Sequence, residues 1–461
     1  MAKLNDIEHF SYNLSPHQLS TFEFNNKNTL KLSQLIDMNA LDSNKGVDVG
    51  SENYLYSSPN IFLRTDVLSK HSFIPCLDKD IVQPINPNCF INMNLRAGDI
   101  ILTKDSNIGE CAILAEDLPN AMLCGAFYRL PLIKNKYYVF AILKSDIFKD
   151  QLDIMVPKGA TIRHAGKKFL DCKIPFPKDI STITKVENLV KEILYFENKI
   201  NLFEKRIYSL IEEELQKTPM NDYIKPKVSF DLLMNDKRLD ESFHDEYIHK
   251  LNFKIKNYPH GFKTLKDFGY EVKRGQNLQV SQIGNSIYYD NFAQNLYSLI
   301  KPTNFTNHGT ILTKEYIGNK LQLSELNDGD IVFSAEGTIG KCVLFTNLSH
   351  KSITNIHGIV LYGPDVYTGA YISSVLRYYK SINLFDYLSV GGQGGSLGPD
   401  LLKELPIPLI PMSVRKTIQD LYFNESTDKE EMGILQIDAY INDLKEKLKI
   451  IIDNIKNENN N

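Results

Sequence analysis

The sequence predicts an α+β protein in which two homologous β-rich domains are separated by two long helices that form an antiparallel coiled coil. Three observations lead to this fold class: a block of sequence occurs twice, each copy carries short β-type runs, and each copy is followed by a heptad pattern. The chain has 461 residues, which is too long for one ordinary domain core, so several domains are expected.

The repeat is clearest between "GDIILTKDSNIGECAIL" (residues 98–114) and "GDIVFSAEGTIGKCVLF" (residues 329–345), which align without a gap at an offset of 231. The same offset places "LDCKIPFP" (170–177) over "LLKELPIP" (401–408). Because an internal repeat marks one structural unit used more than once, we expect both copies to share a fold.

Within each copy, β-branched and aromatic runs are broken by Gly, Asn and Asp, which predicts strands joined by tight turns. The runs on either side of "TKDSN" and "SAEGT" predict a hairpin whose tip carries those polar residues. The proline-rich segment that ends each copy is expected to be an extended arm. Turn-closing carboxylates, turn glycines and core cysteines are predicted at Asp99 and Asp330, Gly109 and Gly340, and Cys111 and Cys342, although the two aspartates could also be offered as catalytic carboxylates.

Each copy is followed by apolar residues that step by three and four positions, which is the heptad pattern of a coiled-coil seam. The predicted interface consists of Val186, Leu189, Ile193, Phe196, Ile200, Phe203, Ile207 and Leu210 in the first helix, and of Ile434, Ile437, Ile441, Leu444, Leu448, Ile451 and Ile455 in the second. The segment "NESTDKEEMG" (424–433) interrupts the second helix and is expected to be either a loop or a helical stutter.

The resulting plan has a first β-rich domain at residues 1–180, a first coiled-coil helix at 181–217, a second β-rich domain at 218–412 and a second helix at 413–461. A lone amphipathic helix cannot bury such a seam. The chain must also pass through the whole second domain between the first helix and the second. An antiparallel pair is therefore the simplest arrangement, with a rod of about 50 Å at ~1.5 Å per residue.

The net charge is −4, but residues 1–180 hold 20 basic and 20 acidic side chains, and residues 218–412 hold 19 of each. Composition alone therefore gives no support for a nucleic-acid footprint. The sequence shows no secretory signal and no apolar stretch long enough to span a membrane, which predicts a cytoplasmic protein. Six cysteines without a C-x-x-C pair predict free thiols and no metal site.

Motifs of catalysis are missing from the sequence. It contains no [DNS]-P-P-[YFW], no G-x-S-x-G and no H-E-x-x-H, and its ten histidines are scattered singly. The chain is therefore expected to be a non-enzyme that directs chemistry done by others.

The order of these parts resembles the specificity subunit of type I restriction-modification systems. The resemblance is carried by "LRAGDIILTKDSNIGECAIL … KGATIRHAGKKFLDCKIPFPKD" and "LNDGDIVFSAEGTIGKCVLF … GGQGGSLGPDLLKELPIPLIP", each followed by a heptad helix, and by "RLDESFHDEYIHK" at residues 238–250. It covers roughly residues 29–455, while residues 1–28 lack an "RLDESF"-like opening, so the start of the first domain fits this pattern less well.

This resemblance implies that each β-rich domain is a target-recognition domain that reads one half of a bipartite duplex DNA target. It also implies that the coiled coil docks methyltransferase subunits and, in a full complex, restriction and translocase subunits. S-adenosylmethionine and ATP would be bound by those partners, and no cofactor or metal is expected in this chain.

Three groups of polar residues are then candidates for DNA contact. The first lies in two loops, one near the end of each copy, at residues 158–168 and 390–398, here called the late loops. Its members are Arg163, His164, Lys167, Lys168, Gln393 and Ser396. The second lies at the hairpin tips, residues 104–107 and 335–338: Lys104, Ser106, Asn107, Glu336 and Thr338. The third group precedes the second copy's core: Lys273, Arg274, Gln276 and Asn277.

By chemistry, Arg163 suits a guanine edge and Gln393 an adenine edge, while Lys167 and Lys168 suit phosphates. Each group could instead be an ordinary solvated loop. The alternative function is a non-catalytic, pseudo-twofold coiled-coil adaptor that binds protein partners rather than DNA, and the neutral domains favour it. Because the copies differ at nearly every proposed contact, the two half-sites are expected to differ.

Overall fold

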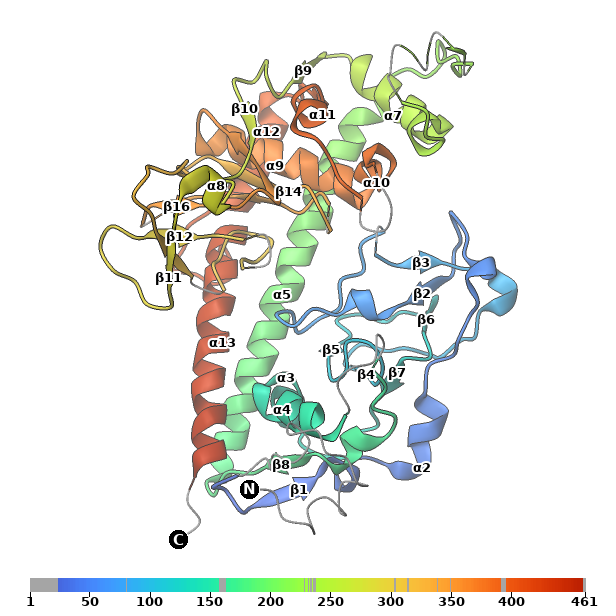
Figure 1. Cartoon of the computed structure of the whole chain (residues 1–461). Helices are drawn as coiled ribbons and strands as arrows, with labels where there is room; N and C mark the ends of the chain where they lie inside the picture. Colours follow the sequence, from blue (N-terminus) through green and yellow to red (C-terminus); the bar gives the residue numbers. More distant parts are fainter. Residues whose placement is uncertain are drawn as a thin grey trace. The chain divides into compact units, whose positions relative to one another are not determined.

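The computed structural model of the chain (Figure 1) describes residues 24–79, 81–156, 163–227, 229–230, 232, 234, 238–301, 304–312, 315–337, 339–348, 350–390 and 395–458. Its contacts divide the chain into two compact units: unit 1 comprises residues 1–199 and 440–461, and unit 2 comprises residues 200–439. Each unit mixes helices and strands, which confirms the predicted α+β class.

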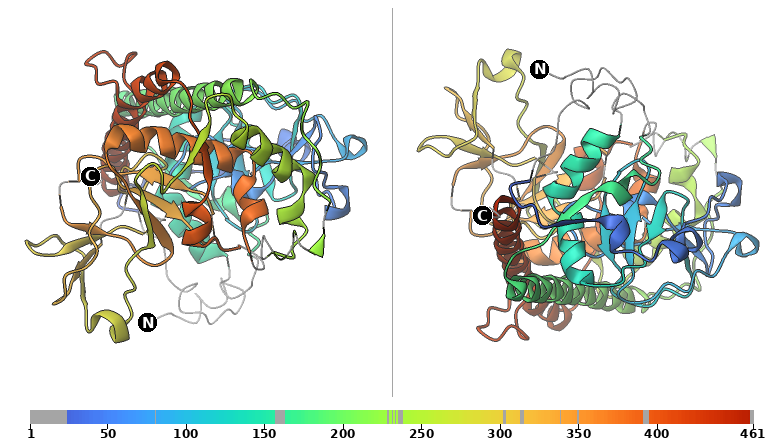
Figure 2. Two further views of the ribbon diagram at one scale, coloured as in Figure 1. Left: turned by 90° about the horizontal axis from the view of Figure 1, so that it is seen from above. Right: turned by 90° about the horizontal axis from the view of Figure 1, so that it is seen from below.

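Unit 1 contains three small sheets. One has the order β5–β4–β7, one the order β3–β2–β6 with β2 and β6 parallel, and one pairs β1 with β8, a pair seen from below in Figure 2. The strands are β1 (Thr29–Lys31), β2 (Ile61–Leu63), β3 (Gln83–Pro84), β4 (Ile100–Thr103), β5 (Cys111–Ile113), β6 (Ala121–Leu123), β7 (Phe127–Arg129) and β8 (Lys173–Pro175). The helices are α2 (Met38–Leu41), α3 (Lys136–Lys144), α4 (Asp146–Met155) and the short turns η1 (Leu32–Gln34), η2 (Asp42–Asn44), η3 (Ser51–Asn53), η4 (Thr65–Val67), η5 (Pro87–Cys89) and η6 (Lys168–Asp171).

Unit 2 repeats this plan with additions. Its sheets have the orders β10–β17–β14–β15, β11–β13–β12–β16 and β9–β18. The strands are β9 (Phe262–Thr264), β10 (Glu271–Arg274), β11 (Ile287–Tyr289), β12 (Tyr297–Leu299), β13 (Tyr316–Gly318), β14 (Ile331–Ser334), β15 (Cys342–Leu344), β16 (Ser352–Ile353), β17 (Gly358–Tyr362) and β18 (Pro406–Pro408). The helical elements are η7 (Ser242–His244), α7 (Glu246–Lys256), α8 (Val280–Ile283), α9 (Val366–Ser381), α10 (Leu384–Leu388), α11 (Pro399–Lys403) and α12 (Met412–Phe423).

The two units share their hydrogen-bonded scaffold. In unit 1 the Tyr138 hydroxyl donates to the carbonyl of Pro175, and 233 residues later the Tyr371 hydroxyl donates to that of Pro408. The strand pair β4–β5 in unit 1 matches β14–β15 in unit 2 at an offset of 231. The proline segments expected to be extended arms are extended, but they are paired as β8 and β18, because β1 and β9 offer each of them a strand edge.

The predicted turn and core residues are confirmed. The amide of Arg96 donates to Asp99 at 2.9 Å and that of Asn327 to Asp330 at 2.7 Å, so both aspartates close turns. Gly109 and Gly340 have φ of 81° and 85°, and a Cβ there would lie 2.7 Å from Leu152 and 2.6 Å from Phe385. Cys111 and Cys342 are buried.

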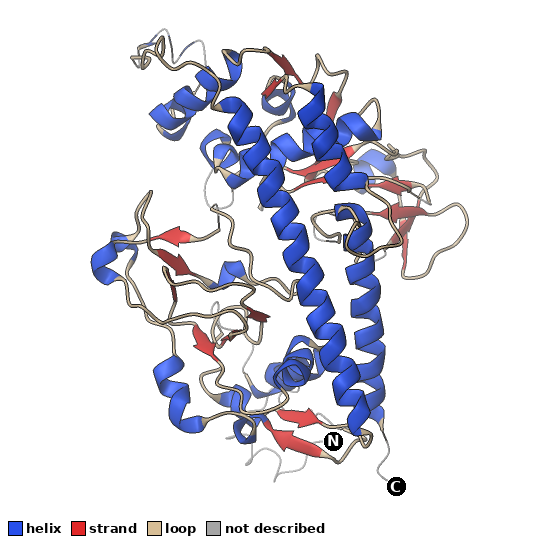
Figure 3. Cartoon of the chain, turned by 180° about the vertical axis from the view of Figure 1, so that it is seen from behind, coloured by secondary structure: helices blue, strands red, loops and turns tan. Residues whose placement is uncertain are grey.

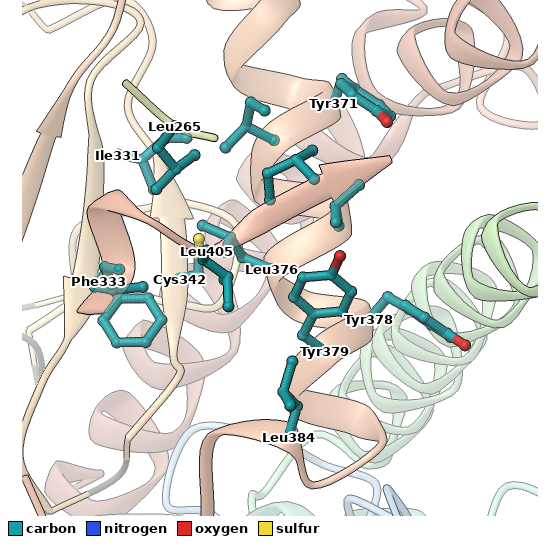
Figure 4. Close-up of a cluster of buried hydrophobic side chains, with 14 of the residues drawn as sticks. Leu265, Ile331, Phe333, Cys342, Tyr371, Leu376, Tyr378, Tyr379, Leu384 and Leu405 are labelled. Carbon is teal, nitrogen blue, oxygen red and sulfur yellow. The ribbon is translucent and has the colours of Figure 1, made fainter. Parts of the chain in front are cut away.

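The core of unit 2 is formed where α9 covers the sheet that contains β14 and β15. Figure 4 shows Leu376 and Tyr379 of α9 among the strand side chains Ile331, Phe333 and Cys342. Asp365 begins α9 because its carboxylate accepts bonds from the amides of Tyr367 and Thr368. The strand side chains face both this helix and a second cluster around Val332 and Val343, so the strands are apolar on both faces.

Helix α5 (Ile180–Leu215) is continuous (Figure 3), and α13 (Ile434–Asn457) is the other long helix. Within unit 1, their residues 180–199 and 440–457 run antiparallel. The amide of Lys178 donates to Glu458 at 3.0 Å, and further along the pair the Tyr440 hydroxyl donates to Glu192 at 2.6 Å. Asn26 lies against the end of α13, where its side-chain amide donates to the carbonyls of Phe176 and Ile455.

Most of the predicted seam residues are buried in the part of the chain that the structure describes, and Leu189, Phe203 and Ile451 are half-buried. Four further apolar residues of these helices are buried as well: Val190, Ile211, Leu215 and Ile452. In unit 2, Ile207, Leu210 and Ile211 of α5 belong to the same cluster as Ile418 and Ile434. The seam as a coiled-coil interface stays a prediction.

The interruption at residues 424–433 is a loop that separates α12 from α13. The side chain of Gln436 accepts a bond from the backbone amide of Ser426 at 2.9 Å and donates one to the carbonyl of Ser426 at 2.8 Å. At Gly433, a Cβ would lie 2.7 Å from the amide nitrogen of Asn424, so only glycine fits. The loop is therefore a defined structure and not a helical stutter.

Candidate nucleic-acid interface

In each unit the structure brings the hairpin tip and the late loop together. In unit 1 the amide of Ser106 donates to the carbonyl of Arg163 at 3.1 Å, and the amide of Ala165 donates to that of Lys104 at 2.8 Å. In unit 2 the amide of Leu397 donates to the carbonyl of Ala335 at 3.0 Å, and Glu336 and Ser396 form an isolated β-bridge. We call each of these pairs of segments a loop junction.

The third group joins the junction of unit 2 through Arg274. Its guanidinium donates to the carbonyls of Ile356 and Leu397, both at 3.2 Å, and approaches Glu336 at 3.3 Å. Arg274 therefore holds three segments together. The neighbouring members are also engaged: Lys273 pairs with Glu271 at 2.6 Å, Gln276 accepts from the amide of Ser324, and Asn277 accepts from that of Gln279.

Unit 1 has a counterpart of the third group that the sequence analysis missed. In unit 1, Lys45 forms an antiparallel backbone bridge with Tyr128, at the position where Arg274 pairs with Ile359 in unit 2. The parallel bridge between Val47 and Cys124 in unit 1 likewise matches the one between Gln276 and Asn355 in unit 2. The sequence contains a weak signal, a basic residue followed by glycine in "KGV" and "RGQ", but the offset there is 229 and not 231. This change of register hid the match. A pocket of about 230 Å³ beside Lys45 is lined by residues that include Asn44 and Arg129.

The cations of the unit 1 junction are bonded to protein groups. Arg163 donates to Asp153 at 2.8 Å, and His164 Nδ1 lies 2.8 Å from Asp105, which also pairs with Lys104. Lys167 lies 2.7 Å from Asp42, and this bond raises the pKa of Lys167. Lys168 donates to the carbonyl of Met155 at 2.8 Å. The acids Asp42 and Asp153 were not predicted, because only the fold brings them to these loops, and Asp105 was not predicted although it lies in the hairpin tip itself.

The unit 2 junction has a histidine that was also not predicted. His357 Nδ1 lies 2.7 Å from Glu336, and its carbonyl accepts a bond from the amide of Ala335. The matching carbonyl in unit 1 belongs to Ala126, which bonds the amide of Lys104. No motif in the sequence marks His357, because its role follows only from its place beside β14.

The remaining predicted residues are placed as follows. Ser106 has a positive φ of 61°, and the carbonyl of Asn107 accepts from the Thr103 hydroxyl and from the amide of Glu110. Ser396 forms two backbone bonds with Val390. Gln393 and Thr338 lie outside the described residues. All the predicted DNA contacts stay predictions.

Among the described residues, no group of three or more His, Cys, Asp or Glu side chains could hold a metal ion. No helix in the described part of the chain is both long and apolar enough to cross a membrane.

Comparisons with known proteins follow the same direction as the sequence resemblance. No family model and no curated protein matches the chain. Solved structures do match: the S subunit of a type I restriction-modification system from M. genitalium, at 12% identity and a TM-score of 0.36, covers 96% of this chain and 98% of its own. The HsdS subunit from Thermoanaerobacter tengcongensis has 13% identity and a TM-score of 0.29, covering 94% and 96%.

A chain solved in work on complex assembly and conformational transition of the type I R-M system has 13% identity and a TM-score of 0.30, covering 95% of this chain and all of its own. The chain is thus similar to type I specificity subunits over nearly its whole length.

Proposed function

We propose that the chain is the DNA sequence-specificity subunit of a type I restriction-modification system. Each unit contributes one target-recognition domain, and the two domains read the halves of a bipartite duplex target. The observation that carries this proposal is that one backbone scaffold presents two loop junctions with different side chains, Lys104 and His164 in one and Arg274 and His357 in the other. Readers of two different half-sites require such a combination.

The long helices set the distance between the readers and dock the partners. In this proposal α5 and α13 form an antiparallel coiled coil, supported by the Lys178–Glu458 and Glu192–Tyr440 contacts within unit 1. Methyltransferase subunits bind this coiled coil, and restriction and translocase subunits join them in a full complex. S-adenosylmethionine and ATP belong to those partners, the chain itself is non-catalytic, and the complex works in the cytoplasm.

The test is to co-express the chain with candidate methyltransferase subunits from its own genome, to purify the complex and to map the methylated bases. We expect the methyltransferase to co-purify and the methylated site to be two unlike half-sites separated by a spacer. Methylation at a strict palindrome, or a chain that purifies without a methyltransferase, contradicts the proposal.

Arg163→Ala sharpens this test at one junction. Loss of a bidentate guanine contact costs about 1–3 kcal/mol of discrimination at one base pair, so one half-site should become degenerate while the other stays unchanged. Arg96→Ala is the matched control, because it removes one positive charge from the same unit outside the loop junction. Equal relaxation of both half-sites by Arg163→Ala would show that the residue does not read a base.

The second candidate is a protein-binding adaptor, and the pairing of the junction cations with acids favours it. The two candidates differ in salt dependence. DNA binding weakens steeply with salt because counterions are released, whereas an adaptor shows no such binding to duplex DNA. Titration of the purified complex with a random 30-base-pair duplex at 50 and 200 mM salt distinguishes them.

A further inference from the structure

The basic side chains of the loop junctions and the third group are paired with carboxylates. Lys168 differs from the others, because it donates to the carbonyl of Met155. The pairs are Lys104–Asp105, His164–Asp105, Arg163–Asp153, Lys167–Asp42, Lys273–Glu271, Arg274–Glu336 and His357–Glu336. A surface meant to bind a polyanion is thus neutralised by its own acids.

Two of these acids occupy the same place in the repeat. Asp105 and Glu336 are equivalent at the offset of 231, and each accepts bonds from one cation and one histidine. Their partners come from different segments: His164 lies in the late loop of unit 1, whereas His357 directly precedes β17 in unit 2. The tip carboxylate with two basic neighbours is therefore present twice with different chain segments, which is more than a chance surface contact would give.

The exposure of these groups fits competition with a phosphate. The Arg274 and Glu336 side chains are 32% and 41% exposed, and the rings of His164 and His357 are 68% and 59% exposed. The Lys104 and Asp105 side chains are only 13% and 15% exposed, so in unit 1 a phosphate reaches the histidine more readily than the lysine. Exposed ion pairs contribute little to stability, so a neighbouring phosphate can replace the carboxylate. The carboxylate still opposes that exchange, because it competes for the cation and repels the DNA backbone.

We propose that Asp105 and Glu336 are specificity-determining residues that suppress the binding of non-target duplex DNA. Each pairs with one cation and one histidine of its own loop junction, so phosphates alone do not gain enough to displace it. On the target, contacts to base edges are added and the exchange becomes favourable. This inference rests on the proposed function, and it accounts for the equal numbers of acidic and basic side chains in residues 1–180 and 218–412.

The experiment measures the affinity of the full chain, in complex with its methyltransferase, for a random 30-base-pair duplex and for the mapped target. Asp105→Asn and Glu336→Gln are compared with wild type between 50 and 200 mM salt. Each variant should bind the random duplex about 3–10-fold more tightly at the lower salt, with a salt slope steeper by about 1, because one more phosphate contact forms. Affinity for the target should rise less, so the ratio of target to random affinity falls.

The matched controls remove a carboxylate that is also ion-paired but lies outside the loop junctions. Asp117→Asn removes the partner of Arg96, and this pair lies at the end of the β4–β5 hairpin that is opposite to the tip. Glu315→Gln removes the partner of Lys301 beside β13. Both should leave random-duplex binding and its salt slope unchanged. Thermal melting checks that each variant folds, and if Asp105→Asn does not, Asp153→Asn replaces it, because this carboxylate is 45% exposed and pairs with Arg163.

The outcomes separate the inference from the proposed function. If wild type binds DNA but the tip variants keep its affinity and salt slope, the inference is wrong and the proposed function stands. If the variants lose target binding without gaining random binding, the carboxylates read bases, for instance a cytosine amino group, and the inference is again wrong. If neither wild type nor any variant binds duplex DNA, the proposed function fails and the inference fails with it.

Discussion

The hairpin tips of the two units have the same backbone bonds and different side chains. The amide of Lys104 bonds the carbonyl of Ala126 in unit 1, and the amide of Ala335 bonds the carbonyl of His357 in unit 2. In unit 1 the cation that pairs with the tip carboxylate is Lys104, which belongs to the tip itself. In unit 2 it is Arg274, which belongs to β10. The backbone is the constant part of the repeat, and the surroundings of the tip carboxylate are the part that changes.

The comparison teaches which residues can vary without refolding a unit. Gly109 and Gly340, Asp99 and Asp330, and the Tyr138 and Tyr371 hydroxyl bonds recur because each satisfies a local steric or hydrogen-bonding need. The tip side chains bond groups that come from different segments in the two units. Changes in the scaffold should therefore have large and matched effects in the two units, and changes elsewhere should have small or unequal effects.

The largest effect is expected in the matched cores. Leu102 and Phe333 are fully buried and occupy equivalent positions on β4 and β14. Leu102→Ala should cost about 2–5 kcal/mol and Phe333→Ala about 3–5 kcal/mol of unfolding free energy, through lost burial and a cavity. Hydrogen exchange read by mass spectrometry should localise each loss to its own unit, and Leu321→Ala, which truncates an exposed side chain, should change little. Equal loss of protection in both units would contradict this.

A smaller, equal effect is expected from the tyrosine hydroxyls. Tyr138→Phe and Tyr371→Phe each leave a buried proline carbonyl without its donor, which costs about 1–2 kcal/mol. Burial raises the pKa of Tyr371 to about 12, so its hydroxyl keeps its proton and its donor role at neutral pH. Urea unfolding of the two variants and of Tyr367→Phe, whose ring is exposed, measures the difference. A cost in one unit alone would mean that the two bonds are not equivalent.

The smallest effect is expected in the pH dependence of the unfolding free energy, which should differ between the two units. His308 of unit 2 is buried beside Arg377 and Tyr422, with Glu204, Asp438 and Lys341 nearby. Arg377 can only donate, so His308 Nδ1 accepts its bond at 3.0 Å and the ring is held neutral. Burial accordingly lowers the pKa of His308.

The lowered pKa of His308 determines how the unfolding free energy changes with pH. Below pH 6.5 the unfolded chain takes up a proton at His308 that the folded chain does not, so the unfolding free energy falls as the pH drops from about 7 to 5. His308→Asn keeps an acceptor for Arg377 and should flatten this dependence. The pKa of His71 in unit 1 is lowered by burial and by neighbouring lysines, but His71 is more exposed, so His71→Asn should flatten it less. A pH dependence that both variants leave unchanged would rule out this role for His308.

The elements that the sequence predicted well are those fixed by local chemistry. The alternation around Gly109 and Gly340 predicted the hairpins, and the three-and-four spacing predicted two long helices, because periodicity and turn residues act over short distances. Proline predicted an extended backbone for residues 173–175 and 406–408 but not their partners, since pairing with β1 and β9 depends on residues about 145 positions away.

The loop junctions could be predicted only in part. The polar residues of the tips and late loops were found, because the repeat aligned them. The acids Asp42 and Asp153, the clamp role of Arg274 and the position of His357 were not, since each depends on a contact that only the folded chain makes. Lys45 was missed because the register of the repeat shifts by two residues before it.

The way the chain forms unit 1 has a consequence for its synthesis. Unit 2 is one continuous stretch, residues 200–439, so all of it is synthesised before residues 440–461. Unit 1 needs those last residues, because Asn26 bonds the carbonyl of Ile455 and Tyr440 bonds Glu192. The later half of the repeat can therefore complete its fold first, which reverses the usual order from the N-terminus. A growing chain that stops short of residue 440 carries all of unit 2 and an incomplete unit 1.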